Sequence, residues 1–83
     1  MTEQEINEVC DTLELVIFNT QKTNPQVSVL NLPKSALGFE NEDALDVLFS
    51  IEAEMKRRNY KCEIKKDGTE ESLFIQLSNA SLN

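Results

Sequence analysis

The chain has 83 residues, a formal net charge of −7 and a hydrophobic fraction of 40%, and these values predict one small globular domain around one hydrophobic core. The negative charge favours a protein partner with a basic surface. It argues against binding to a membrane and disfavours binding to nucleic acid, because both are negatively charged. The absence of histidine, of Cys-x-x-Cys and of a glycine-rich phosphate loop predicts no enzyme, no cofactor and no metal site.

The first predicted helix begins after Thr2 and fades between residues 19 and 24, before Pro25. Thr2 can accept a hydrogen bond from a backbone N–H of the first turn, and Glu5 stands three residues later, which is the pattern of a capping box. Apolar residues recur at helical spacing and predict one buried stripe. The stripe consists of Ile6, Val9, Cys10, Leu13, Val16 and Ile17.

A short strand and a loop are expected next. Residues 26–32 are rich in β-branched and apolar side chains, which is typical of a strand, and Pro33 ends the strand because proline has no N–H to donate. In the loop that follows, at 33–40, we expect Leu37 and Phe39 to point inward.

The second predicted helix has Asn41 as its N-cap, followed by two acidic residues that suit the positive end of the helix dipole. Three consecutive cations at 56–58 suit the negative end, and Asn59 tolerates the left-handed conformation that often stops a helix. The predicted buried stripe consists of Ala44, Leu45, Leu48, Ile51 and Met55.

The last third of the chain predicts a β-hairpin. Apolar and charged residues alternate along its first strand, which indicates one buried face. Asp67-Gly68 is a strong two-residue turn. A turn there places Cys62 opposite Leu73 on the buried face and Lys65 opposite Glu70 on the exposed face. The two strands are predicted at 60–66 and 69–77.

Together these elements predict an α+β fold, a two-layer sandwich in the order α-β-α-β-β with a C-terminal β-hairpin. The strand-helix-strand unit favours parallel strands joined by a right-handed crossover, so the three-stranded sheet is expected to be mixed. Because each helix has one apolar stripe, both helices should cover the same face of the sheet. Residues 1–83 are expected to form a single domain, with 79–83 as a flexible tail.

The two cysteines and the lack of a targeting segment indicate in which cellular compartment the protein is expected. No basic segment followed by an apolar run opens the chain, and the longest apolar run, 15–18, is too short to span a membrane. We therefore expect a cytoplasmic protein whose two thiols are reduced and behave as small buried hydrophobes. A disulfide between Cys10 and Cys62 is the alternative that the sequence leaves open.

An acidic residue stands at every third position from residue 5 to residue 14, and no lysine or arginine precedes Lys22. Like charges three or four residues apart on a helix repel one another, so these residues cost the helix stability. Two interpretations stay open: a face that keeps the protein soluble, and a surface for a basic partner. This acidic ridge consists of Glu5, Glu8, Asp11 and Glu14.

Leu15 and Phe18 break the apolar pattern of the first helix, because they lie at about 180° and about 120° from Ile6 at 100° per residue. With the acidic residues beside them they form an apolar spot with a charged rim, which is typical of a binding patch. Burial of 15–18 on both sides is the alternative. Phe74 is another apolar residue on a predicted exposed face. The candidate partner-binding residues are Glu5, Glu8, Asp11, Glu14, Leu15 and Phe18.

These features predict a small acidic interaction protein, without catalytic activity, that inhibits or adapts a larger basic or nucleic-acid-binding target. Phage and mobile-element inhibitors of restriction or CRISPR complexes have this kind of composition, so a phage inhibitor is one expected identity. Two alternatives stay open. One is a homodimeric structural or regulatory protein that associates through the first helix, and the other is a weak nucleic-acid binder that uses the basic segment 56–66.

Overall fold

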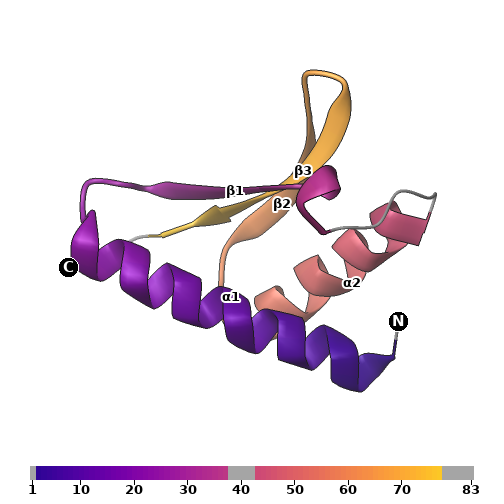
Figure 1. The fold of residues 1–83 in the computed structure, drawn as a ribbon, viewed down its shortest axis with the longest axis horizontal. Coiled ribbons are helices and arrows are strands. Elements are labelled where there is room, and N and C mark those ends of the chain that lie inside the picture. Colours follow the sequence, from indigo (N-terminus) through magenta and orange to yellow (C-terminus); the bar gives the residue numbers. More distant parts are fainter. Residues whose placement is uncertain (1, 38–42, 78–83) are drawn as a thin grey trace.

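The computed structural model describes residues 2–37 and 43–77 (Figure 1). Helices and strands follow one another in the predicted order α-β-α-β-β, which confirms the α+β fold class. The predicted tail at 79–83, the inward position of Phe39 and the N-cap at Asn41 lie outside the described residues. The elements are α1 (Glu3–Thr23), β1 (Val29–Pro33), the short 3-10 helix η1 (Lys34–Leu37), α2 (Asp43–Arg57), β2 (Cys62–Asp67) and β3 (Glu70–Gln76).

Helix α1 begins with the predicted capping box. The backbone N–H of Glu5 donates to Thr2 Oγ1 at 3.2 Å, and the backbone N–H of Thr2 donates to Glu5 Oε1 at 2.7 Å. Two N–H groups that the first turn would leave unpaired are therefore satisfied. The helix ends at Thr23, before Asn24 and Pro25, as predicted.

The buried side of α1 is narrower than the predicted stripe. Val16 was expected to be buried there but is 40% exposed, and Val9 is only partly buried. At 100° per residue Val16 lies at the margin of the stripe, and only a narrow arc of α1 can reach the core that it shares with α2 and β3. The buried residues of α1 are Ile6, Cys10, Leu13 and Ile17.

Helix α2 ends where the sequence predicts, but its buried side differs from the predicted stripe, because Val47 is buried and Leu45 is only partly buried. Asn59 has a φ of 72°, the left-handed conformation that asparagine tolerates. The N–H of Tyr60 then donates to the carbonyl of Met55 at 3.1 Å and closes the end of the helix. The buried residues of α2 are Ala44, Val47, Leu48, Ile51 and Met55.

The sheet has the strand order β1-β3-β2, and both neighbouring pairs are antiparallel. The prediction of a mixed sheet is therefore wrong. Strands β1 and β2 do run parallel to each other, but β3 lies between them and pairs with both. We attribute the central place of β3 to its inner face, because Leu73 and Ile75 are fully buried and a central strand is covered better than an edge strand.

The hairpin of β2 and β3 forms, but its register differs by two residues from the predicted one. Asp67 lies opposite Glu70, so Gly68 and Thr69 form the loop. Gly68 has a φ of +70°. Glycine with positive φ at the first loop position is the preference of the type II′ turn, whose twist matches that of the two strands.

A shift of two residues leaves every side chain on its predicted face of the sheet, because side chains alternate with a period of two. Cys62 lies opposite Ile75 instead of Leu73, still on the core side. The predicted cross-strand ion pair of Lys65 does not form. Instead its Nζ lies 3.1 Å from Glu63 Oε2 on the same strand.

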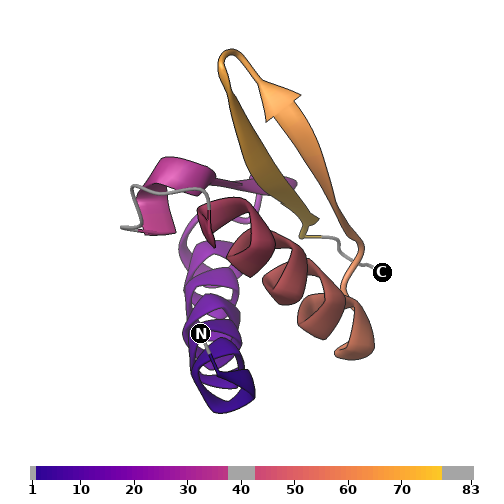
Figure 2. The ribbon, with the colours of Figure 1, turned by 90° about the vertical axis from the view of Figure 1, so that its right-hand side faces the viewer.

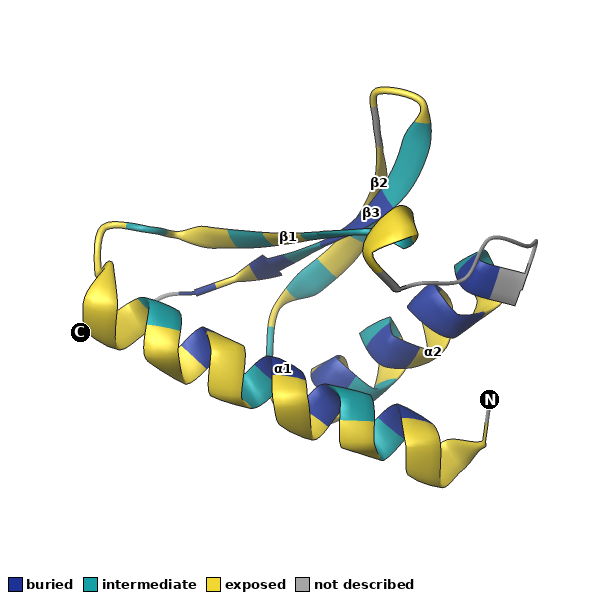
Figure 3. Cartoon of the chain, viewed as in Figure 1, coloured by how far each residue is buried: buried dark blue, intermediate teal, exposed yellow. Residues whose placement is uncertain are grey.

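Both helices lie on the same side of the sheet, as predicted (Figures 1 and 2). Their buried side chains and those of β3 form one hydrophobic core between the two layers (Figure 3). The outward side of α1 is exposed, and the face of the sheet away from the helices is exposed in part. Val29 and Phe74 lie on that second face.

Candidate partner-binding surface

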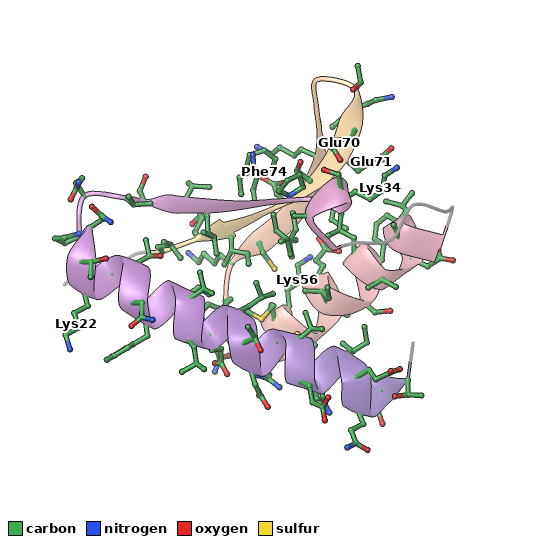
Figure 4. The ribbon with its side chains drawn as sticks, viewed as in Figure 1. Lys22, Lys34, Lys56, Glu70, Glu71 and Phe74 are labelled. Atoms are coloured by element: carbon green, nitrogen blue, oxygen red, sulfur yellow. The ribbon has the colours of Figure 1, made fainter. Side chains whose placement is uncertain are left out.

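One line of exposed residues runs along the outward side of α1. Its members are alternately four and three residues apart, so successive side chains lie one above the other on the helix. In Figure 3 this side of α1 is almost entirely exposed, and Figure 4 shows Lys22 pointing outward at its C-terminal end. We call this line the outer stripe. It consists of Gln4, Glu8, Asp11, Leu15, Phe18 and Lys22.

Leu15 and Phe18 are the apolar centre of the outer stripe. Leu15 is 65% exposed and Phe18 is 62% exposed, which confirms that both lie off the core stripe. Burial on both sides, the alternative considered for 15–18, does not occur among the described residues. Being three residues apart, the two side chains can contact one partner surface together.

The four residues of the acidic ridge make different contacts within the protein, and Glu5 and Glu8 differ most clearly. Glu5 belongs to the capping box, and the hydrogen bond from the backbone N–H of Thr2 is the main cause that lowers the pKa of its carboxyl group. Glu8 lies on the outer stripe, where Gln4 Nε2 donates to its Oε2 at 3.4 Å. Glu5 therefore stabilises its own helix, whereas Glu8 is presented to solvent.

Asp11 and Glu14 face a cation that comes from the end of α2. Arg58 Nη1 lies 2.9 Å from Asp11 Oδ1 and 2.8 Å from Glu14 Oε1. The Nε of Arg58 donates to Glu54 Oε2 at 2.8 Å, and its Nη2 donates to the carbonyl of Asn7 at 3.4 Å. One planar guanidinium thus joins the two helices, a geometry that the single ammonium of lysine could not reproduce.

Tyr60 completes this group, because its hydroxyl donates to Glu14 Oε2 at 3.0 Å. Hydrogen bonds from Arg58 and then Arg57 lower the pKa of Glu54, and the bond to Glu54 is the main cause that raises the pKa of Arg58. Burial, followed by the bond to Glu14, raises the pKa of Tyr60. We call this group the Arg58 cluster. It consists of Asp11, Glu14, Glu54, Arg58 and Tyr60.

The Arg58 cluster explains how α1 tolerates half of its acidic ridge. The counter-charge is 47 residues from Asp11 and 44 from Glu14, so the sequence of α1 alone does not reveal it. The sequence holds one indication of it. Arg58 follows Ile51 by seven residues and Met55 by three, which is the spacing of the buried side of α2, and a partly buried arginine needs acidic partners.

The basic segment 56–66 is largely paired within the protein. Four of its six basic residues have a nitrogen within 3.4 Å of a carboxylate oxygen. The segment therefore presents less positive charge than its sequence indicates, which weakens its interpretation as a nucleic-acid site. The four residues are Lys56, Arg57, Arg58 and Lys65.

Phe74 lies on the face of the sheet away from the helices (Figure 4), as predicted. It is half-buried, and Lys65 Nζ lies 5.8 Å from the centroid of its ring, within the range of a cation–π contact. A shallow hollow beside the ring is lined by Val29, Glu63 and Gln76, among others. This hollow is small and open, and it brings together no catalytic set of side chains.

Both thiols are free. Cys10 is fully buried in the core, and the half-buried Cys62 has its Sγ 3.7 Å from the carbonyl oxygen of Glu52. Within residues 2–37 and 43–77, no three His, Cys, Asp or Glu side chains are grouped so that they could hold a metal ion. Among the described residues, no helix combines the length and the apolar character that a membrane crossing requires.

The buried thiol makes the protein less stable at high pH. Burial raises the pKa of Cys10 from its usual 9.0 to about 11, so its contribution to stability is complete below pH 9 and is lost as the pH rises through 11. Between pH 8 and pH 10 we expect the free energy of unfolding to fall by about 1 kcal/mol from this group. Burial also raises the pKa values of Tyr60 and Cys62, which act in the same direction.

Urea unfolding at pH 8, 9 and 10 measures this effect. The Cys10→Ala variant is the control, and its stability should fall less steeply with pH than that of the wild type. An identical pH dependence in the two proteins would contradict the assignment to Cys10.

The fold and the surface therefore define a two-layer α+β domain with one exposed apolar and acidic helix face. Comparison with protein-family models, with curated proteins and with solved structures found no match for this chain.

Proposed function

We propose that this protein is a small, non-enzymatic interaction protein whose outer stripe binds a larger protein with a basic surface and inhibits or adapts it. The observation that carries the proposal is the exposure of Leu15 and Phe18, at 65% and 62%, on the side of α1 that faces away from the core. Large apolar side chains with acidic neighbours are typical of binding patches.

The spacing of the outer stripe supports recognition of α1 by a groove. Helices bound in grooves use anchor residues three and four positions apart, and Asp11, Leu15, Phe18 and Lys22 follow that spacing. Burying Leu15 and Phe18 together would contribute about 3–6 kcal/mol, at about 1.5–3 kcal/mol per side chain. That amount is a large part of the binding free energy of a micromolar complex, which is about −8 kcal/mol.

The charges of the outer stripe differ between its two ends, so they favour one orientation of α1 in the groove of the partner. Glu8 and Asp11 precede the apolar pair, and Lys22 follows it. Because Arg58 already pairs with Asp11, we expect Glu8 to contribute most to the salt dependence of binding. Glu5, the capping residue, should contribute little.

The net charge of −7 supports a target whose own function requires a basic surface. Restriction and CRISPR complexes are basic where they bind nucleic acid, and a small acidic protein is attracted to such a surface. A phage or mobile-element inhibitor of this kind is the identity that we propose. The location in the cell follows from it, since these targets are cytoplasmic.

A second candidate function is a homodimer that associates through α1. The outer stripe is self-complementary, because an antiparallel pair of α1 helices centred on Leu15 would place Glu8 opposite Lys22 of the second copy. The apolar pair of each copy would then lie at the centre of the contact.

The test compares three baits in affinity capture with quantitative mass spectrometry: wild type, Leu15→Ser with Phe18→Ser, and Phe49→Ser. Phe49 is 50% exposed on α2, so its replacement is a matched control for loss of an exposed aromatic. We expect the double variant alone to lose its partner, with affinity for the purified partner reduced about 100-fold or more. Glu8→Gln should flatten the salt dependence.

Circular dichroism and light scattering separate the other outcomes. Unchanged capture by a folded double variant would refute the proposed surface. A wild-type dimer that becomes monomeric in the double variant would favour the second candidate. If the double variant unfolds, Leu15 and Phe18 belong to the core, and the outer stripe is not a binding site.

A further inference from the structure

Strand β2 is an edge of the sheet, with β3 on its inner side. The N–H of Gln76 donates to the carbonyl of Lys61 at 2.8 Å. Since an antiparallel ladder alternates, residues 61, 63 and 65 direct their backbone groups towards β3, and residues 62, 64 and 66 direct theirs outward. In the part of the chain that the structure describes, no strand pairs with this outer side. Such an edge is a template for another strand.

The opposite edge of the sheet, β1, is a poorer template. The N–H of Leu77 donates to the carbonyl of Ser28 at 2.9 Å, so the same alternation turns Pro33 outward, where it has no N–H to offer. The 3-10 helix η1 follows immediately and ends the extended edge. Strand β2 contains no proline and so can pair along its whole length.

The charges on the exposed face of β2 limit which strand can join it. Glu63 and Lys65 stand two residues apart on that face, and both side chains are 59% exposed. In an antiparallel pair with a second copy, centred on Ile64, Lys65 lies opposite Glu63 of the second copy, and Glu63 lies opposite its Lys65. Each cross-strand pair then joins opposite charges.

The backbone agrees with this register. Centring on Ile64 places residues 62, 64 and 66 of one copy opposite 66, 64 and 62 of the other, so all the outward N–H and C=O groups meet, with about six N–H···O bonds. A register shifted by one residue would place outward groups opposite groups that are already bonded to β3. The other registers that the backbone allows therefore differ from this one by an even number of residues.

Shifts of two residues bring like charges together. Centring on Glu63 places the two Glu63 side chains opposite each other and Lys61 opposite Lys65, and centring on Lys65 places the two Lys65 side chains opposite each other. Like charges directly opposite each other destabilise a strand pair. Of these three registers, only the pairing centred on Ile64 fits both the backbone and the charges, and it uses the whole of β2 (Cys62–Asp67).

We propose that two copies of this chain associate through β2, antiparallel and centred on Ile64, to form one six-stranded sheet. Ile64, half-buried in the single chain, is then covered by its counterpart. Lysines on an edge strand usually prevent unwanted pairing. Here Lys61, just before β2, and Glu63 and Lys65 on its exposed face alternate in sign. A second copy of β2 is therefore disfavoured in the two registers shifted by two residues and favoured when centred on Ile64. The dimer does not depend on the proposed function of α1, and it presents two outer stripes at once.

Charge reversal on β2 tests the proposal. Lys65→Glu or Glu63→Lys turns both central pairs into like charges, and both side chains are exposed, so the fold should be kept. In light scattering the wild type should approach twice the chain mass of 9.4 kDa as its concentration rises. Each single variant should dissociate with a Kd at least about tenfold higher. Lys22→Glu, the same charge change on α1, should leave the dimer intact.

Mixing the two single variants gives the decisive result. In a pair of one Lys65→Glu chain and one Glu63→Lys chain, opposite charges meet again at both positions, so a heterodimer should form although neither variant dimerises alone. The amide of Ile64 should also gain protection from hydrogen exchange when the wild type dimerises. A wild type that stays monomeric at millimolar concentration would overturn the proposal, as would a dimer that only Lys22→Glu or the Leu15→Ser, Phe18→Ser variant dissociates.

Discussion

Replacing Leu48 with alanine should lower the free energy of unfolding by about 2–5 kcal/mol. Leu48 is fully buried on α2 and belongs to the core that the two helices share with β3. The truncation removes buried methyl groups and leaves a cavity that close-packed neighbours fill only in part. A domain of this size has a total stability of only about 5–10 kcal/mol, so this one change should be visible directly in urea unfolding followed by circular dichroism.

The neighbouring residue supplies the matched control. Phe49 has the larger side chain but is 50% exposed, so Phe49→Ala should cost less than about 1 kcal/mol. Hydropathy alone does not separate these two adjacent residues, whereas the structure separates them sharply. Equal losses from both variants would mean that α2 presents a different face to the core.

The helices could be predicted well because their ends depend on local chemistry. Thr2 and Glu5 satisfy each other's backbone N–H groups, and Asn59 adopts a positive φ. Neither feature needs a contact distant in sequence. Burial at the margin of a helix is different, because the rest of the fold decides it. Val16 has the spacing of a core residue but lies beyond the reach of α2 and is 40% exposed.

The order and register of the sheet could be predicted only in part. The alternation of apolar and charged residues assigned each side chain of the hairpin to its correct face. Because that alternation has a period of two, it is equally compatible with a loop at Asp67-Gly68 and one at Gly68-Thr69, whose registers differ by two residues. A type I′ loop at Asp67-Gly68 needs a positive φ at both residues, and in the structure Gly68 has one but Asp67, which pairs with Glu70 in the ladder, does not. The insertion of β3 between β1 and β2 depends on packing between distant segments, which no local pattern reports.

The candidate surface could also be predicted only in part from the sequence. Helical geometry alone placed Leu15 and Phe18 outside the core stripe, and their exposure bears this out. The same spacing of three and four residues also contains Gln4 and Lys22, which were not among the residues predicted to bind a partner. The pairing of Asp11 and Glu14 with Arg58 is a contact between two helices. A search for charges within one helix could not find it.

Replacing Arg58 with alanine should lower the free energy of unfolding by about 1–2 kcal/mol, because it removes the centre of the Arg58 cluster. Arg58 is only 20% exposed and bonds carboxylates from both helices. Without it, Asp11 and Glu14 regain their mutual repulsion along α1, and the contact between the helices is lost. Urea unfolding at pH 7 measures the loss.

Arg57→Ala is the matched control, because Arg57 is 64% exposed and, among the residues that the structure describes, pairs with Glu54 of its own helix. Its loss should be less than about 0.5 kcal/mol. The pH dependence provides a second check. Arg58 helps to hold the pKa of Glu54 below its usual 4.5, so this contribution to stability is complete above pH 4.5 and is lost as the pH falls through the lowered value. The difference between wild type and Arg58→Ala should therefore shrink in acid. Equal losses from the two arginine variants at pH 7 would show that the Arg58 cluster does not hold α1 and α2 together.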